Sequence, residues 1–208
     1  DRKLVTSEGE EILSQIDSWG IHELRRHKLI WSGWGPMQSL GELQVRIPDS
    51  NWGYRHLFGV DAKKLRLFLV SLLWRAAATS LREFTAIQIP PSDLETLRMM
   101  VVRGDAHPYS FYACQLIQLS SIGTIHNHSP LAQIKTIPAT TSQPEAEVHI
   151  FRFYFDGLIV HFHRSDQPPG YAERMGSLVV GGNDELVVTT VPYEDSTQRV
   201  MLDEIMRS

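Results

Sequence analysis

The sequence predicts an α+β fold in which a helical N-terminal half packs on an antiparallel sheet of hairpins in the C-terminal half. Helical patterns come first along the chain, β-rich runs follow them, and the strongest single signal is the stretch Glu147–Arg164. We expect one domain over residues 1–208. The alternative is two lobes, a helical one over 1–105 and an antiparallel β lobe with a C-terminal helix over 106–208.

In Glu147–Arg164, two β-rich runs flank Asp156-Gly157, a dipeptide typical of type I′ turns because both positions tolerate positive φ. This turn fixes which residues of the two runs face each other. The expected apolar face consists of Phe155/Leu158, Phe153/Val160 and Phe151/Phe162. The other face carries Tyr154/Ile159, Arg152/His161 and Ile150/His163. One face therefore belongs to a core, and the other mixes basic and imidazole groups with apolar ones.

The N-terminal region begins with a capping box, in which Ser7 is the expected N-cap and Glu10 the third helical residue. The helix that follows places Ile12, Ile16 and Trp19 on one side. We expect Gly20 to end or bend this helix, and a second helical segment to cover His22–Leu29.

A longer helix is predicted from the N-cap Asp61 to about Ser80, with apolar residues recurring at helical spacing. It is apolar nearly all round, which places it centrally in the core. Arg75 near its end would need a carboxylate or carbonyl partner if it were buried. The alternative is that Arg75 reaches solvent at the helix end. A further capping box at Ser92 predicts a helix through Arg103, closed by Gly104.

The remaining elements are shorter. Trp31–Gly59 is rich in glycine and aromatic residues and is expected to be loop with one strand near Glu42–Ile47. Further strands are predicted at Phe111–Leu119 and Ile134–Ile137, a second hairpin at Ser177–Val180 and Glu185–Val191, and a short amphipathic helix over the last fifteen residues.

Composition excludes some classes of function. The net charge of −4 gives no overall basic excess of the kind typical of nucleic-acid-binding proteins, although local basic patches remain. Cys114 is the single cysteine, so neither an intramolecular disulfide nor a paired-cysteine zinc site can form. No apolar run is long enough to span a bilayer, and we expect a cytoplasmic protein. The chain begins at Asp1 without Met, which fits either processing or an upstream segment.

Two histidine pairs are candidate metal ligands. On a strand, residues i and i+2 point to the same side, so each pair could present two imidazoles to zinc or another divalent metal. The candidate ligands are His126, His128, His161 and His163. The alternative is that these are exposed strand histidines beside Arg152.

Basic and tryptophan residues suggest contacts with a nucleic acid or a protein partner. The candidate contact residues are Arg25, Arg26, Lys28, Trp34, Trp52, Arg75 and Arg152. For the basic run at 25–28, and for a second one at Lys63, Lys64 and Arg66, the alternative is a solvated helix face. For the tryptophans, the alternative is that they cover the helix at 61–80.

Three segments together resemble the C-terminal region of a group of poorly characterised bacterial proteins. They are the stretches at 67–76 (LFLVSLLWRA), 94–100 (LETLRMM) and 151–158 (FRFYFDGL). In that group the N-terminus looks like an HNH-type zinc module, and Thr6–Glu10 resembles the segment after its last cysteine pair. The cysteine pairs and the catalytic histidine expected of that module are absent from this chain, so the resemblance assigns no catalytic residue.

The resemblance implies a nucleic-acid-directed bacterial protein, the C-terminal portion of an HNH-like nuclease or of a protein in anti-phage defence, with DNA as partner. One alternative is a non-catalytic protein-interaction subunit that binds a protein partner or forms a homo-oligomer. The other is a small metal-dependent enzyme that uses the histidine pairs.

Overall fold

The computed structural model of the 208-residue chain describes residues 6–126, 128–137 and 146–207 and confirms an α+β fold. Its helices are α1 (Ser7–Arg26), α2 (Ala62–Ala78), α3 (Pro91–Arg103), α4 (Tyr171–Met175) and α5 (Thr197–Arg207). Its strands are β1 (Val45–Arg46), β2 (Gly53–Leu57), β3 (Cys114–Leu119), β4 (Leu131–Ile137), β5 (Ala146–Phe155), β6 (Leu158–His163) and β7 (Leu186–Val191).

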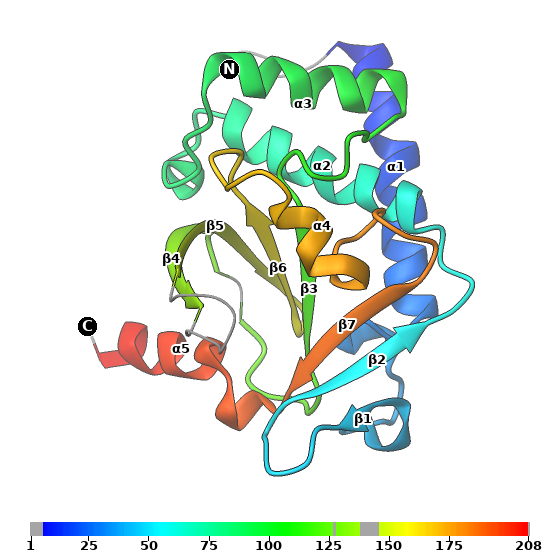
Figure 1. The fold of residues 1–208 in the computed structure, drawn as a ribbon, viewed down its shortest axis with the longest axis vertical. Coiled ribbons are helices and arrows are strands. Elements are labelled where there is room, and N and C mark those ends of the chain that lie inside the picture. Colours follow the sequence, from blue (N-terminus) through cyan, green and yellow to red (C-terminus); the bar gives the residue numbers. More distant parts are fainter. Residues whose placement is uncertain (1–5, 127, 138–145, 208) are drawn as a thin grey trace.

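The strands form one sheet of seven in the order β1-β2-β7-β3-β6-β5-β4 (Figure 1). Neighbouring strands are antiparallel except β3 and β7, which are parallel, so the sheet is mixed. The predicted second hairpin is wrong. Strand β7 pairs with β2 and β3, whereas Gly176–Leu178 forms a 3-10 turn and Val179 bridges Gln115. Sequence patterns missed this because β7 pairs only with strands distant in the chain.

The hairpin of β5 and β6 has the predicted register. Arg152 lies opposite His161, and Phe151 lies opposite Phe162. The turn residues Asp156 and Gly157 have φ values of 51° and 83°, as a type I′ turn requires. A Cβ at position 157 would also lie 2.5 Å from the ring of Trp31, so only glycine fits there.

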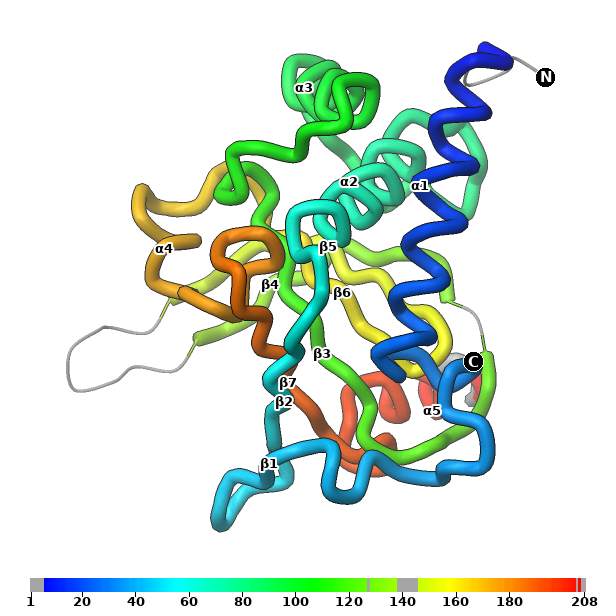
Figure 2. Tube along the Cα trace, turned by 90° about the vertical axis from the view of Figure 1, so that its right-hand side faces the viewer, coloured from blue at the N-terminus to red at the C-terminus, as the bar shows by residue number. Residues whose placement is uncertain are grey.

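Helices α1 and α2 cover one face of the sheet, and α4 lies on the other side (Figure 2). The covered face carries the phenylalanines of β5 and β6, and its core cluster includes residues from Leu13 to Val188. Gly20 does not end α1, as the sequence suggested, because the helix continues to Arg26. A Cβ at Gly20 would lie 2.3 Å from the ring of Phe68, so glycine permits the close approach of α1 and α2.

Helix ends follow the expected chemistry with small shifts. Asp61 accepts a hydrogen bond from the Lys64 amide and caps α2 as predicted. Gly104 closes α3 in the left-handed region with φ of 68°. The N-cap of α1 is Thr6 rather than Ser7, and α3 begins at Pro91 without a side-chain cap. The C-terminal amphipathic helix is present as α5.

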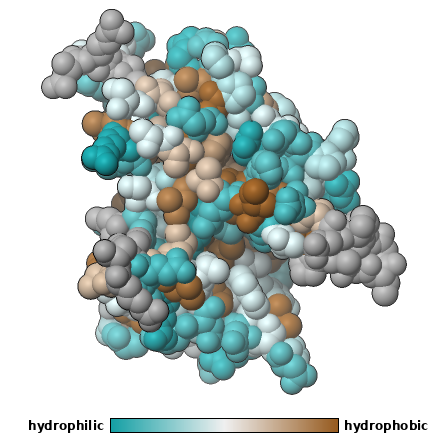
Figure 3. Space-filling view, turned by 90° about the vertical axis from the view of Figure 1, so that its left-hand side faces the viewer, coloured by the Kyte–Doolittle hydropathy of each residue, from teal (hydrophilic) through white to brown (hydrophobic). Residues whose placement is uncertain are grey.

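The other face of the sheet carries two small apolar clusters. One contains Trp31, Trp34 and Tyr193, and the other contains Ala113, Ala172 and Val179 beside α4. On the side of the molecule that shows β4 and α5, hydrophobic residues form small patches separated by hydrophilic ones (Figure 3). Between the two clusters the sheet presents polar and cationic side chains, and the candidate site lies there.

Candidate anion-binding site

Four side chains form a basic stripe across β4, β5 and β6. Register and alternation place them on the face that looks toward α5. The members of the basic stripe are Lys135, Arg152, His161 and His163. Of these, Arg152, His161 and His163 are buried and Lys135 is half-buried.

A pocket of about 470 Å³ lies between the sheet and α5, and three members of the stripe line it. Its sheet side includes Arg152, Lys135 and His161, and α5 contributes Met201. Trp52 lines the same pocket and is 45% exposed. The remaining apolar lining residues are Ile117, Ile134, Ile150, Ile159, Val191 and Val200, and the remaining polar ones are Gln133, Asp195, Ser196, Thr197 and Glu204. A pocket of this size that combines apolar walls with convergent polar groups is typical of small-molecule sites.

Arg152 is the central group of the pocket and is only 4% exposed. Its Nη1 donates to Sδ of Met201 at 3.0 Å, and its Nη2 donates to Oγ1 of Thr197 at 3.4 Å. Among the described residues no carboxylate lies within ion-pair distance of it. Burial lowers the pKa of Arg152 to about 10, so the guanidinium remains charged at neutral pH. The thioether and the hydroxyl are weak acceptors for a cation. They therefore offset little of the free-energy cost of removing this charge from water.

The neighbours of Arg152 add further unpartnered groups. Lys135 has no hydrogen-bond or ion-pair partner within the described part of the chain, and burial lowers its pKa. Nδ1 of His161 is buried without a partner. Burial, followed by the charges of Lys135 and Arg152, lowers the pKa of His161 well below its usual value. Two cations and an uncharged imidazole therefore converge where an anion would relieve their mutual repulsion.

Two carboxylates line the same pocket at its exposed edge. Asp195 and Glu204 are both exposed, and neither forms an ion pair with the basic stripe. The interior of the pocket is therefore cationic, and its acidic groups remain at the solvent boundary.

The histidine pairs do not assemble into a metal site in the described residues, which contain no group of three or more metal-ligating side chains. His126 lies stacked on Tyr154, with its Nδ1 2.7 Å from the Thr124 carbonyl and its Nε2 2.9 Å from Nε2 of Gln198. The carbonyl requires a proton on Nδ1, so Nε2 accepts from Gln198 and is occupied. His128 lies against the same tyrosine.

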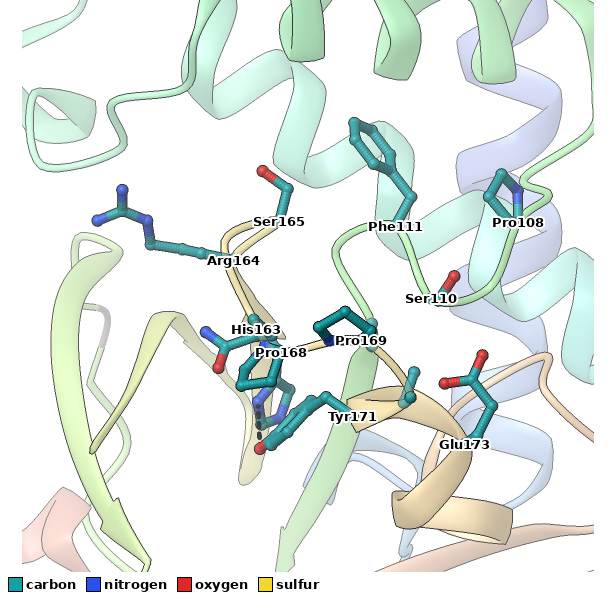
Figure 4. Close-up of a pocket in the computed structure, with 14 residues that line it drawn as sticks. Pro108, Ser110, Phe111, His163, Arg164, Ser165, Pro168, Pro169, Tyr171 and Glu173 are labelled. Carbon is teal, nitrogen blue, oxygen red and sulfur yellow. Dashed lines mark hydrogen bonds between the residues drawn. The ribbon is translucent and has the colours of Figure 1, made fainter. Parts of the chain in front are cut away.

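His163 faces a second pocket, of about 280 Å³, beside α4. Its Nδ1 lies 3.1 Å from the hydroxyl of Tyr171, and Figure 4 shows this pair with Glu173 and Ser110 on the far side of the pocket. Nε2 of His163 is buried without a partner. Burial, and then the charge of Lys135, lower the pKa of His163 to about 4. This imidazole is therefore neutral at physiological pH.

The predicted contact residues on the first loop and α1 lie away from the basic stripe. Arg26 donates to the Gly59 carbonyl at 2.9 Å, and Arg25 donates to the Ser32 hydroxyl at 3.5 Å. Trp34 is only 2% exposed, and its Nε1 donates to the Lys28 carbonyl at 2.8 Å. Trp34 is thus a core residue and offers no surface for contact, but it packs in the cluster with Trp31 and Tyr193 and not, as the packing alternative expected, on the helix at 61–80.

The other predicted contacts divide into two groups. Arg75 forms a two-pronged ion pair with Asp17 at 2.7 and 2.8 Å and is therefore already paired. Trp52 and Arg152 come together in the pocket beneath α5, together with His161. Sequence reasoning missed Lys135. Leu131 lies opposite Arg152, and Lys135 is four residues further along β4, so both lie on the same face of the sheet as Arg152. The sequence could have shown this only if the full length of β4 and its register had been predicted.

The structure also corrects one basic run. Arg66 is 2% exposed rather than part of a solvated helix face. It donates to the carbonyls of Ala106 at 2.9 Å and Phe111 at 2.5 Å, and so fixes the segment that leads into β3.

Comparison of the chain with protein-family models, with curated proteins and with solved structures gave no significant match. None of the described helices has the length and apolar character needed to cross a membrane. The functional argument therefore depends on the geometry of the pocket.

Proposed function

We propose that this chain is a nucleic-acid-directed binding domain that takes a phosphate group at the basic stripe. One observation carries the proposal: the Arg152 guanidinium is buried beside an open pocket, with a thioether and a hydroxyl as its acceptors. A phosphate would supply the missing negative charge and several strong acceptors. The unpartnered Lys135 and His161 on the same pocket supply further donors.

Phosphate fits this arrangement better than a lone carboxylate. A guanidinium can bind two phosphate oxygens side by side, while an ammonium acts on the remaining charge. The buried Arg152 and the unpartnered Lys135 are binding groups, and the proposal assigns no bond cleavage to them. The proposal is therefore recognition without chemistry at this site.

Isothermal titration with inorganic phosphate tests the proposal. The wild-type protein is expected to bind phosphate, and Arg152→Met is expected to bind at least about tenfold more weakly, because a charge-assisted contact is lost. Arg98→Met is the matched control, since Arg98 lies exposed on α3 and pairs with Glu95. Equal phosphate affinity in the wild type and Arg152→Met would overturn the proposal.

A second function is favoured by a separate observation. The first strand and its flanks expose Leu43, Val45 and Ile47, at 44%, 51% and 42%. An exposed apolar patch next to a sheet edge is typical of a protein-interaction surface. A protein complex that persists at high salt and is lost in Val45→Ser with Ile47→Ser would support this function. A complex that dissociates at high salt would not support this function.

The finer assignments from the resemblance stay predictions. They are the link to an HNH-like nuclease, the bacterial defence role and the intracellular location. Measurement of zinc content and of DNA cleavage by the protein isolated from its native host would test the nuclease assignment. Absence of both would leave the phosphate-binding proposal untouched.

A further inference from the structure

The pocket beneath α5 has a cationic end and an aromatic end. Arg152 and His161 lie at one end and are 4% and 7% exposed. Trp52 lies at the other end, directly before β2, and is 45% exposed. These two ends offer different chemistry to one ligand, namely ion pairing and stacking.

The sheet register sets the distance between the two ends. Gly53 pairs with Thr190 on β7, which places Trp52 next to Val191. From there the order continues through β3 to β6, which carries His161. Across the sheet, the three strand spacings from β2 to β6 correspond to roughly 14 Å, and the four spacings to Arg152 on β5 correspond to roughly 19 Å. A single small anion cannot touch both ends, so a ligand that uses the whole pocket has two parts.

The sheet side of the pocket between the two ends is apolar. It consists of Val191, Ile117 and Ile159, one residue from each of the three strands that separate Trp52 from Arg152, while Ser196 and Thr197 at the start of α5 also line the pocket. An apolar wall suits the flat ring of a base or the carbon face of a sugar, and it does not suit a second charged group. An apolar face of the ligand therefore belongs against the sheet side of the pocket.

Burial of the cationic end favours a terminal phosphate over a phosphodiester within a strand. A phosphodiester within a strand carries a sugar on each side, and a duplex surrounds it with further groups. Arg152 and His161 are too deeply buried to reach such a phosphate from the side. A terminal phosphate has three free oxygens and a second charge, and it can enter the pocket end-on.

We infer that the ligand is a nucleotide unit with a terminal phosphate, whose phosphate binds Arg152 and Lys135 and whose base stacks on Trp52. This inference rests on the proposed phosphate site and specifies its ligand class. The unit is either a free nucleotide or the phosphorylated end of a single strand, since both present the same chemistry.

Titration calorimetry with matched probes tests the inference. The probes are inorganic phosphate, ribose 5-phosphate, adenosine 5′-monophosphate, and a short single-stranded DNA with either a 5′-phosphate or a 5′-hydroxyl. Adenosine monophosphate is expected to bind about tenfold more tightly than ribose 5-phosphate, because stacking of one base contributes that much. Removal of the 5′-phosphate is expected to abolish binding of the strand end.

Variants of the aromatic end separate stacking from folding. Trp52→Ala is expected to lower the affinity for adenosine monophosphate to that of ribose 5-phosphate, while Trp52→Phe retains most of it. Phe58→Ala is the matched control, because Phe58 is an aromatic residue that is 78% exposed just after the other end of β2 and does not line the pocket. It is expected to change neither affinity.

Each outcome decides between the claims. The inference would be overturned if the wild type bound adenosine monophosphate and ribose 5-phosphate with equal affinity. It would also be overturned if Trp52→Ala bound adenosine monophosphate as tightly as the wild type. If inorganic phosphate still bound in an Arg152-dependent way, the proposed function would survive that result. Equal binding of the phosphorylated and hydroxyl strands would also overturn the inference. Binding of the phosphorylated strand alone, or of the free nucleotide alone, would identify which source the pocket takes.

Discussion

Arg66 and Arg152 are both buried arginines, but their surroundings differ. Arg66 donates to the carbonyls of Ala106 and Phe111. It also has longer contacts with the Pro108 and Tyr112 carbonyls and Sγ of Cys114. Arg152 has one thioether and one hydroxyl as acceptors, beside a pocket. The donors of the Arg66 guanidinium are therefore occupied by acceptors of the fold, whereas the Arg152 guanidinium can still donate to a ligand.

This difference shows that burial of a charge does not by itself indicate function. A buried cation that organises backbone carbonyls stabilises the fold, because those carbonyls would otherwise lack donors. A buried cation without strong acceptors costs free energy in the isolated protein. That cost is explained if a ligand completes the site.

Loss of Arg66 is expected to have the largest effect on stability. Arg66→Met would leave several buried carbonyls without donors and should lower the free energy of unfolding by at least about 3 kcal/mol. Chemical denaturation would measure the change, with Arg98→Met as a control that alters stability little. A loss below about 1 kcal/mol would break the comparison, because Arg66 would then not organise its loop.

Acid is expected to destabilise the basic stripe. The pKa of His163 falls to about 4 in the folded protein, so the unfolded chain binds more protons below its ordinary value of 6.5. Stability is therefore full above pH 6.5 and decreases as the pH falls toward 4, by roughly 3 kcal/mol from His163. Burial and then the charge of Lys135 lower the pKa of this imidazole, and the Tyr171 hydroxyl lies 3.1 Å from its Nδ1.

The variant His163→Gln isolates this contribution. Urea unfolding of the wild type and the variant from pH 7.5 to 4.5 should show a shallower pH dependence in the variant. Parallel curves for the two proteins would mean that His163 titrates normally in the fold.

Loss of Arg152 is expected to have a small effect on stability. Methionine fills similar space next to Met201, and it removes a buried charge that lacks a carboxylate partner. Arg152→Met should therefore change the free energy of unfolding by less than about 1 kcal/mol in either direction. The contrast with Arg66→Met sharpens the comparison. A loss as large as that of Arg66→Met would instead assign Arg152 a structural role.

The Arg75–Asp17 pair is expected to contribute least. Its side chains are 27% and 37% exposed, so water screens much of the attraction. A double-mutant cycle with Arg75→Met and Asp17→Asn should give a coupling of about 0.5 kcal/mol. A coupling above about 2 kcal/mol would place Arg75 with the structurally essential Arg66.

Local patterns predicted the β5–β6 hairpin because the Asp156-Gly157 turn fixes its register. The opposition of Arg152 and His161 follows from that register and was visible in the sequence. The helical ends at Asp61 and Gly104 were predictable for the same reason, since each depends on one residue and its neighbours.

The rest depends on contacts between distant segments. The parallel pairing of β3 with β7 has no local signal. Arg66 lies in a basic run that resembles a solvated face, and only the loop that covers it shows otherwise. The pocket forms because α5 lies over the stripe, which no pattern within α5 or β5 specifies.

The most direct test of the account is the position of the phosphate in a crystal structure of the protein with adenosine 5′-monophosphate. The account predicts phosphate oxygens at hydrogen-bond distance, about 3 Å, from the Arg152 guanidinium and the Lys135 ammonium. A nucleotide bound elsewhere, with Arg152 still donating to Met201 and Thr197, would contradict it.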